Sequence, residues 1–217
     1  MDTNSKILLN EKICGDLFDS QLILDSYIKF QKFFQSFKRL QKRYFNTSLS
    51  NRETSCVYGI AWEKILYGYI HAKSLELDYG TAYDVAGDGA GAAGDFIFKI
   101  FDDAEGLSYS LNPEITFEIK MSRQTNGCPN WWTNTQALLN KDKESEIINY
   151  SFTMFDSNRI FSAIVKNVTS LDWLGNQNRN RNSTFNKSIF LDKERSNIIM
   201  GSASARGAGT QLLFENA

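Results

Sequence analysis

The sequence has one histidine, three cysteines and no long apolar run, and each scarcity argues against a class of protein. With His71 alone available, a metal site built on two histidines is disfavoured. A Ser-His-Asp hydrolase would have to use His71 as its base, and no Gly-x-Ser-x-Gly motif accompanies it. Gly-Lys-Ser/Thr is also absent from the sequence, which removes the Walker phosphate-binding loop.

The three cysteines, Cys14, Cys56 and Cys128, are odd in number and widely spaced. They therefore predict neither a disulfide framework nor a zinc cluster. No stretch approaches the roughly 18–20 apolar residues that cross a bilayer. Residues 1–12 lack the basic segment followed by an apolar block that marks a secretory signal. We expect a protein of the reducing cytoplasm with no membrane partner.

The length of 217 residues and the hydrophobic content of 42% predict one domain with a sizeable core. We expect N-terminal helices over residues 1–75, a sheet core over about 94–170, and a C-terminal polar loop and tail over 171–217. The fold class is predicted as α/β (α+β), with a mixed central β-sheet flanked by helices.

Charge is segregated along the chain although its net value is only −1. From residue 26 to residue 52 every charged residue is basic, and from residue 76 to residue 118 Lys99 is the only base among ten acids. Such separation suits a protein that holds a polyanion with one surface and a cation with another. The alternative is a solvated basic helix beside an acidic loop.

Residues 22–44 are predicted as a long amphipathic helix with Asp19 or Ser20 as its cap. Its expected apolar side consists of Leu24, Tyr27, Ile28, Phe34, Phe37, Leu40 and Tyr44. A second helix is expected after Thr54 or Ser55. Its expected buried side consists of Ile60, Ile65, Leu66, Tyr69 and Ile70. The glycine-rich residues 80–94 are predicted to be a loop.

The apolar pattern changes at Asp95, after which strands are expected. The predicted strands are residues 95–101 and 115–121, paired as a hairpin, followed by 147–155 and 160–168. A short helix is expected at 135–141 and a polar loop at 176–186. The tail after Met200 has no assigned structure.

The chemistry is expected on the hairpin. Side chains alternate along a strand, so Glu118 and Lys120 should share one face while Phe117 and Ile119 enter the core. A turn centred between Gly106 and Leu107 would place Asp95 opposite Glu118, roughly 5 Å away at Cβ. Two carboxylates that close favour a bridging hard cation such as Mg²⁺. A lysine beside them can orient or help deprotonate a water and offset a phosphate charge, which suits phosphodiester hydrolysis.

These residues resemble the PD-(D/E)XK nuclease superfamily, and type II restriction endonucleases in particular. The family pattern is an acid that opens one strand, then Glu or Asp, any residue and Lys on the next strand. Gly94-Asp95 and Glu118-Ile119-Lys120 match it, although a Pro often stands where this chain has Gly94. Glu63 matches a glutamate that the family tends to carry on the preceding helix. The similarity covers about residues 59–121.

The resemblance implies a restriction-endonuclease-like fold that binds Mg²⁺ through Asp95, Glu118 and the backbone carbonyl of Ile119. Lys120 would assist the attacking water and Glu63 would support a second metal, unless Glu63 is simply a surface carboxylate. Cutting both strands of a symmetric site in double-stranded DNA implies a homodimer. Two alternatives remain: a repair or recombination nuclease of the junction-resolvase type on the same scaffold, and a non-catalytic DNA-binding protein.

Candidate DNA contacts fall into three groups. The phosphate-contact candidates on the basic helix are Lys38, Arg39, Lys42 and Arg43. The candidates that follow Lys120 closely enough to touch substrate are Arg123, Gln124 and Asn126. In the Asn-, Gln- and Arg-rich residues 176–182, Arg179 and Arg181 are candidate base readers, because Arg pairs bidentately with guanine. The alternative for that run is a polar surface loop without a binding role.

Overall fold

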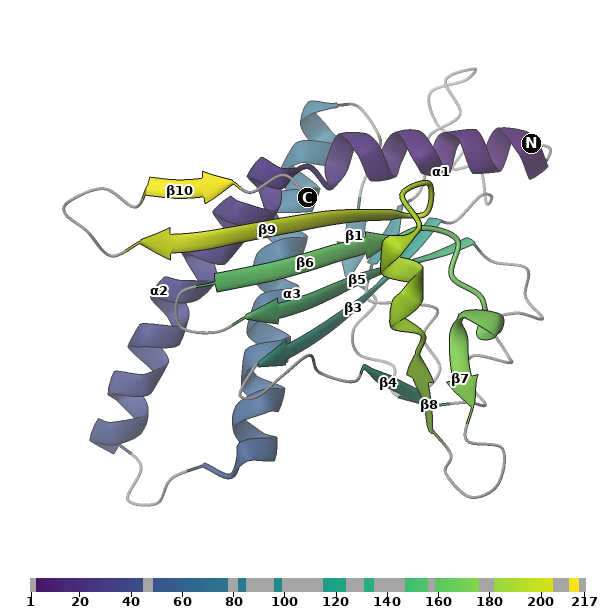
Figure 1. Cartoon of the computed structure of the whole chain (residues 1–217). Helices are drawn as coiled ribbons and strands as arrows, with labels where there is room; N and C mark the ends of the chain where they lie inside the picture. The colour runs from purple at the N-terminus through teal and green to yellow at the C-terminus, as the bar shows by residue number, and fades with distance from the viewer. Residues whose placement is uncertain are drawn as a thin grey trace.

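The computed structural model in Figure 1 describes residues 3–44, 49–77, 82–84, 96–98, 115–123, 131–134, 147–155, 159–175, 182–204 and 211–214. Three α-helices come first: α1 (Thr3–Leu17), α2 (Ser20–Tyr44) and α3 (Asn51–Glu76). The strands are β1 (Ala82–Asp84), β2 (Phe96–Phe98), β3 (Ile115–Arg123), β4 (Trp132–Asn134), β5 (Ile147–Phe155), β6 (Arg159–Val165), β7 (Trp173–Gly175), β8 (Asn182–Phe185), β9 (Ser196–Ser204) and β10 (Gln211–Phe214). Two 3₁₀ helices, η1 (Ser170–Asp172) and η2 (Lys187–Leu191), complete the described part.

The described strands form a seven-stranded sheet in the order β1-β2-β3-β5-β6-β9-β10 and a small sheet in the order β4-β8-β7. Strands β3 and β5 run parallel, and the other neighbours in the large sheet run antiparallel. The helices pack against one face of the large sheet, and the small sheet packs against the other (Figure 1). The predicted class, helices followed by a mixed sheet, is therefore confirmed.

Helix α2 starts as predicted, because the backbone N–H of Leu22 donates to Asp19 Oδ1 over 2.7 Å. Lys73, near the end of α3, forms an ion pair with the same Asp19 carboxylate. The expected apolar side is wrong at its far end, where Leu40 is 50% exposed and Tyr44 is 64% exposed. Figure 1 shows the reason: the last turns of α2 extend beyond the edge of the large sheet, so these side chains do not reach the core.

Helix α3 begins earlier than predicted, at Asn51. Ser50 forms a capping box, in which its hydroxyl accepts from the N–H of Glu53 over 3.3 Å while Glu53 accepts from the N–H of Ser50 over 2.8 Å. Ile60 was expected to be buried but is 58% exposed. The fully or almost fully buried stripe consists of Tyr58, Trp62, Leu66 and Ile70, because the two large rings occupy the side that faces α2 and the sheet.

Several strand predictions are confirmed. Strand β5 has the predicted bounds, and β6 covers most of the predicted residues 160–168. In the hairpin, Phe96 pairs with Phe117, Ile97 with Thr116 and Phe98 with Ile115, which is the register predicted from the turn centre. Asp95 itself lies outside the described residues.

Other predictions fail because strands form where loops were expected. Strand β1 falls within residues 80–94, and β8 falls within the predicted polar loop 176–186. The sheet also continues past residue 170, because β9 pairs along the whole of β6 and β10 adds to β9. These strands are recruited by pairing with distant segments rather than by their own apolar pattern. The helix predicted at 135–141 lies outside the described residues.

Gly201 in β9 is needed where α2 crosses the sheet. A Cβ at this position would lie 2.6 Å from Leu24 Cδ2 and 3.3 Å from Ile160 Cγ2. We expect Gly201→Val to lower the free energy of unfolding by about 1–3 kcal/mol through overpacking. Urea denaturation of the two proteins measures the change. Met200→Val, on the more exposed neighbouring residue, is the control, and equal losses from both substitutions would contradict a specific clash at Gly201.

Candidate functional site

The middle of β3 separates apolar from charged side chains, as the alternation predicted. Phe117 is fully buried and Ile119 nearly so, in the core between the helices and the large sheet. Phe117 stacks on Phe18 with ring centroids 4.4 Å apart, which ties this face of the strand to the segment between α1 and α2. Glu118 and Lys120 consequently extend from the opposite face of the sheet.

Glu118 and Lys120 form an ion pair between Lys120 Nζ and Glu118 Oε1. Their side chains are only 15% and 25% exposed, so both charges are partly withdrawn from water. Partial burial strengthens the attraction between them because less solvent screens it. The pair is therefore held at one place on the strand, next to the neighbouring strand β5, where Glu118 lies opposite Tyr150.

Glu63 of α3 lies close enough to feel both of these charges. Burial raises the pKa of the Glu63 carboxyl, and the charge of Glu118 raises it further, while Lys64 and Lys120 act in the opposite direction. Glu63 is 17% exposed, and Lys64 Nζ lies 3.7 Å from its Oε1. The structure thus places the helix glutamate within electrostatic range of the strand pair, although 55 residues separate Glu63 from Glu118.

Lys64 is a charged member of this group that the sequence interpretation did not include. Its position directly after Glu63 was the available signal, but adjacent residues on a helix point in directions about 100° apart and are not usually paired. Lys64 is 46% exposed, so it reaches Glu63 from the solvent side. It can balance the charge of Glu63 when no other cation is near.

Of the remaining predicted site residues, Asp95, Gln124, Asn126, Arg179 and Arg181 lie outside the described part of the chain. Arg123 is the last residue of β3 and pairs with Phe155, but nothing of its side chain is described. The four candidates on α2, Lys38, Arg39, Lys42 and Arg43, are all exposed. The structure pairs Glu118 with Lys120, places Glu63 within electrostatic range of both, and does not bring the α2 group to them.

The donors present suit a hard divalent cation. Two carboxylates, from Glu63 and Glu118, and the nearby carbonyl of Ile119 are oxygen ligands of the kind Mg²⁺ takes. Burial and the charge of Glu118 raise the pKa of Glu63, and a bound cation would offset both effects. Among the described residues no group of three or more His, Cys, Asp or Glu is arranged to hold a metal. The third predicted acid, Asp95, is not among them.

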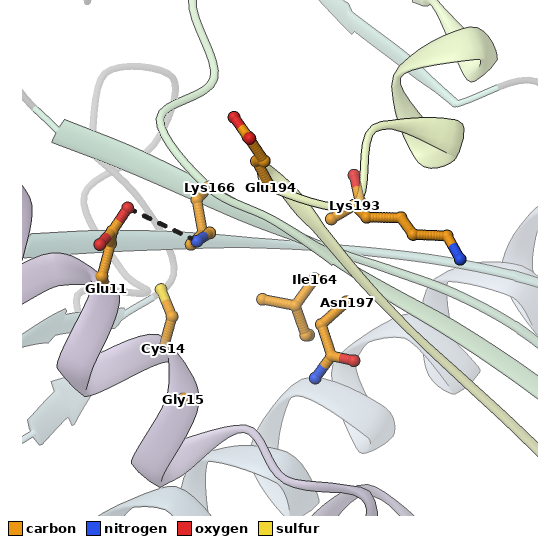
Figure 2. Close-up of a pocket in the computed structure, with 9 residues that line it drawn as sticks. Glu11, Cys14, Gly15, Ile164, Lys166, Lys193, Glu194 and Asn197 are labelled. Atoms are coloured by element: carbon orange, nitrogen blue, oxygen red, sulfur yellow. Dashed lines mark ion pairs between the residues drawn. The ribbon is translucent and has the colours of Figure 1, made fainter. Parts of the chain in front are cut away.

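A separate cavity of about 120 Å³ lies on the helix-covered face (Figure 2). Its lining includes Glu11 and Cys14 from α1 and Lys166 after β6, with Lys166 Nζ 3.8 Å from Glu11 Oε1. Burial raises the pKa of the Cys14 thiol to about 12, so this thiol stays protonated and is a poor nucleophile. None of the predicted site residues that the structure describes lines this cavity.

No protein family matches the chain, and no curated protein or solved structure is significantly similar to it. None of the helices within the described residues is both long and apolar enough to span a membrane. The functional interpretation therefore depends on the arrangement around β3 and on the charge of the surface.

Proposed function

We propose that this protein is a Mg²⁺-dependent endonuclease that hydrolyses phosphodiester bonds of double-stranded DNA, of the type II restriction kind. The observation that supports this most directly is the partly buried Glu118–Lys120 pair on β3 with Glu63 within range of both charges. The β2–β3 register adds support, because its continuation by one residue would put Asp95 opposite Glu118.

In this proposal Asp95, Glu118 and the Ile119 carbonyl would hold Mg²⁺, with Glu63 as a further carboxylate beside them. When bound, Mg²⁺ supplies Lewis-acid polarisation of the phosphate and stabilises the negative charge that develops on its oxygens. The protein contributes the positions of its oxygen donors, which the strand and helix hold before substrate arrives.

Lys120 has two tasks in the proposed reaction. Its Nζ donates a hydrogen bond to the attacking water and so orients the water oxygen towards phosphorus. Its positive charge also offsets the charge that builds up on the phosphate in the transition state. The contact with Glu118 keeps the flexible lysine side chain beside the reaction centre, which lowers the entropy lost when substrate binds.

A restriction enzyme of this type would act as a homodimer, with one site for each strand of a symmetric sequence. The residues that would read that sequence are the candidates after β3 and in residues 176–182. A repair or recombination nuclease on the same scaffold would instead select branched DNA. Comparison of linear and four-way-junction substrates distinguishes the two outcomes.

The proposal predicts cleavage of unmodified plasmid DNA in the presence of Mg²⁺, with fragment ends that share one sequence. Electrophoresis followed by sequencing of the ends measures both properties. Replacement of Mg²⁺ by Ca²⁺ should preserve binding while it suppresses cutting, because Ca²⁺ takes the same oxygens with looser geometry. Full activity in a chelator would contradict metal dependence, and binding without cleavage on any DNA would favour a non-catalytic DNA-binding protein.

A further inference from the structure

The outer surface of α2 carries a continuous basic face. Six basic side chains on this helix are exposed: Lys29, Lys32, Lys38, Arg39, Lys42 and Arg43. No acidic residue occurs between residues 26 and 52, and Asp25, one turn before Lys29, is the nearest acid on α2. The six residues span about 21 Å at 1.5 Å per residue.

The basic face points away from α3. Phe34 and Phe37 of α2 meet Tyr58 of α3, with ring centroids 4.9 Å and 5.7 Å apart. Because an α-helix turns about 100° per residue, Lys32 and Arg39 project from the side opposite these rings. The aromatic side of α2 is thus occupied by α3, and the basic side faces solvent.

The basic face is also separated from the proposed catalytic strand. Helix α3 packs against β3, whereas α2 packs against β9 and, through Phe30 and Phe34, against Phe155 of β5. Both helices therefore lie on one face of the sheet. Glu118 and Lys120 extend from the opposite face, so the phosphates held at that pair are not those that meet α2.

We infer that the outer face of α2 is a second duplex-binding surface, which grips the phosphate backbone of a DNA segment distinct from the segment being cut. This inference rests on the proposed function for the identity of the first segment. Charge complementarity argues for this occupant: the phosphates of one strand follow at about 3.4 Å along the duplex axis, so several of them pass within reach of a basic helix surface about 21 Å long.

Two of the cations are already supported by neighbouring rings. Lys38 Nζ lies 4.2 Å from the centroid of Phe34, and Arg43 Cζ lies 5.2 Å from that of Tyr44. Such cation–π contacts restrict flexible side chains before a ligand arrives. A basic amphipathic helix can instead bind an anionic membrane, but that mode needs a free apolar face. Tyr27, Phe30 and Phe34 are buried in the core, and the exposed Leu40 and Tyr44 lie only near the end of the helix, which favours DNA.

The test uses the full chain carrying Glu118→Gln, so that DNA is not consumed, and a duplex of about 12 base pairs, roughly 40 Å long. Calorimetric titration should give two duplexes per protomer. Adding Lys32→Gln and Arg39→Gln should weaken binding of the second duplex. The slope of log affinity against log salt for that duplex should fall by about 2, since each lost phosphate contact removes about 0.9. The matched control, Lys12→Gln with Lys193→Gln, removes the same charge from exposed positions outside α2 and should keep both duplexes.

One duplex per protomer in both the Glu118→Gln protein and its α2 variant, with equal salt slopes, would overturn the inference. Binding of phosphatidylserine vesicles by α2 without binding of duplex would also overturn it and assign the surface to lipid. Failure of the proposed nuclease activity is seen separately, as absence of cleavage by the unsubstituted protein with Mg²⁺. The titration counts bound duplexes and therefore tests the α2 surface whether or not the cleavage assay detects activity.

Discussion

Glu118→Gln is expected to reduce the rate of DNA cleavage by about 10²–10³-fold, the loss typical when one preorganised electrostatic group is removed from a reaction centre. The substitution keeps the size of the side chain but removes the charge that pairs with Lys120. Lys120→Gln should cause a loss of the same order, because the water and the phosphate then lack the ammonium group. Single-turnover cleavage of a plasmid with Mg²⁺ measures both variants.

Retention of the fold and a substitution outside the site provide the controls for this prediction. Phe117 and Ile119 hold β3 in the core from the other face, so both variants should retain the circular dichroism spectrum of the parent protein. Glu76→Gln, on an exposed residue at the end of α3, removes one carboxylate elsewhere and should cleave at the parent rate. Parent-like cleavage by Lys120→Gln would remove Lys120 from the mechanism.

Asn149→Ala is expected to lower the free energy of unfolding by about 2–3 kcal/mol, because it removes three hydrogen bonds from a buried polar cluster. Asn149 and Asn10 are fully buried and exchange two hydrogen bonds, from Asn10 Nδ2 to Asn149 Oδ1 over 3.0 Å and from Asn149 Nδ2 to Asn10 Oδ1 over 2.7 Å. The backbone N–H of Asn167 also donates to Asn149 Oδ1, over 3.2 Å. Urea denaturation measures the loss.

A double-mutant cycle tests whether the loss comes from this pair. Asn10→Ala and Asn149→Ala together should cost less than the sum of the two single changes, since the second substitution removes a group that the first left unpaired. Asn197→Ala, on an exposed residue of β9, should change the stability by less than about 0.5 kcal/mol. Strict additivity of the two single losses would show that the amides do not act as a pair.

Local pattern was sufficient for several elements near the candidate site. The cap at Asp19, the bounds of β5 and the register of β2 with β3 follow from neighbouring residues and from strand periodicity. The burial of Phe117 and Ile119, with Glu118 and Lys120 on the other face, follows from the same period of two. These features depend on interactions that the nearby sequence already specifies.

Sequence pattern failed where partners lie far apart in the chain. Residues 196–204 are rich in small and polar side chains, yet they form β9 because β6 supplies backbone partners along its whole length. Ile60 fits an apolar repeat but faces solvent, because α2 and the sheet occupy the other side of α3. Local propensity is weak compared with such packing and pairing.

Strand periodicity was enough to predict a carboxylate and a lysine on one face of β3, with apolar neighbours on the other. The electrostatic coupling of Glu63 to this pair, and the direction of the basic face of α2, emerge only from the way the helices pack on the sheet. Electrostatic coupling depends on distance in space, whereas helical and strand periods define only directions about one element. The packing of α3 against β3 brings Glu63 within electrostatic range of Glu118 and Lys120.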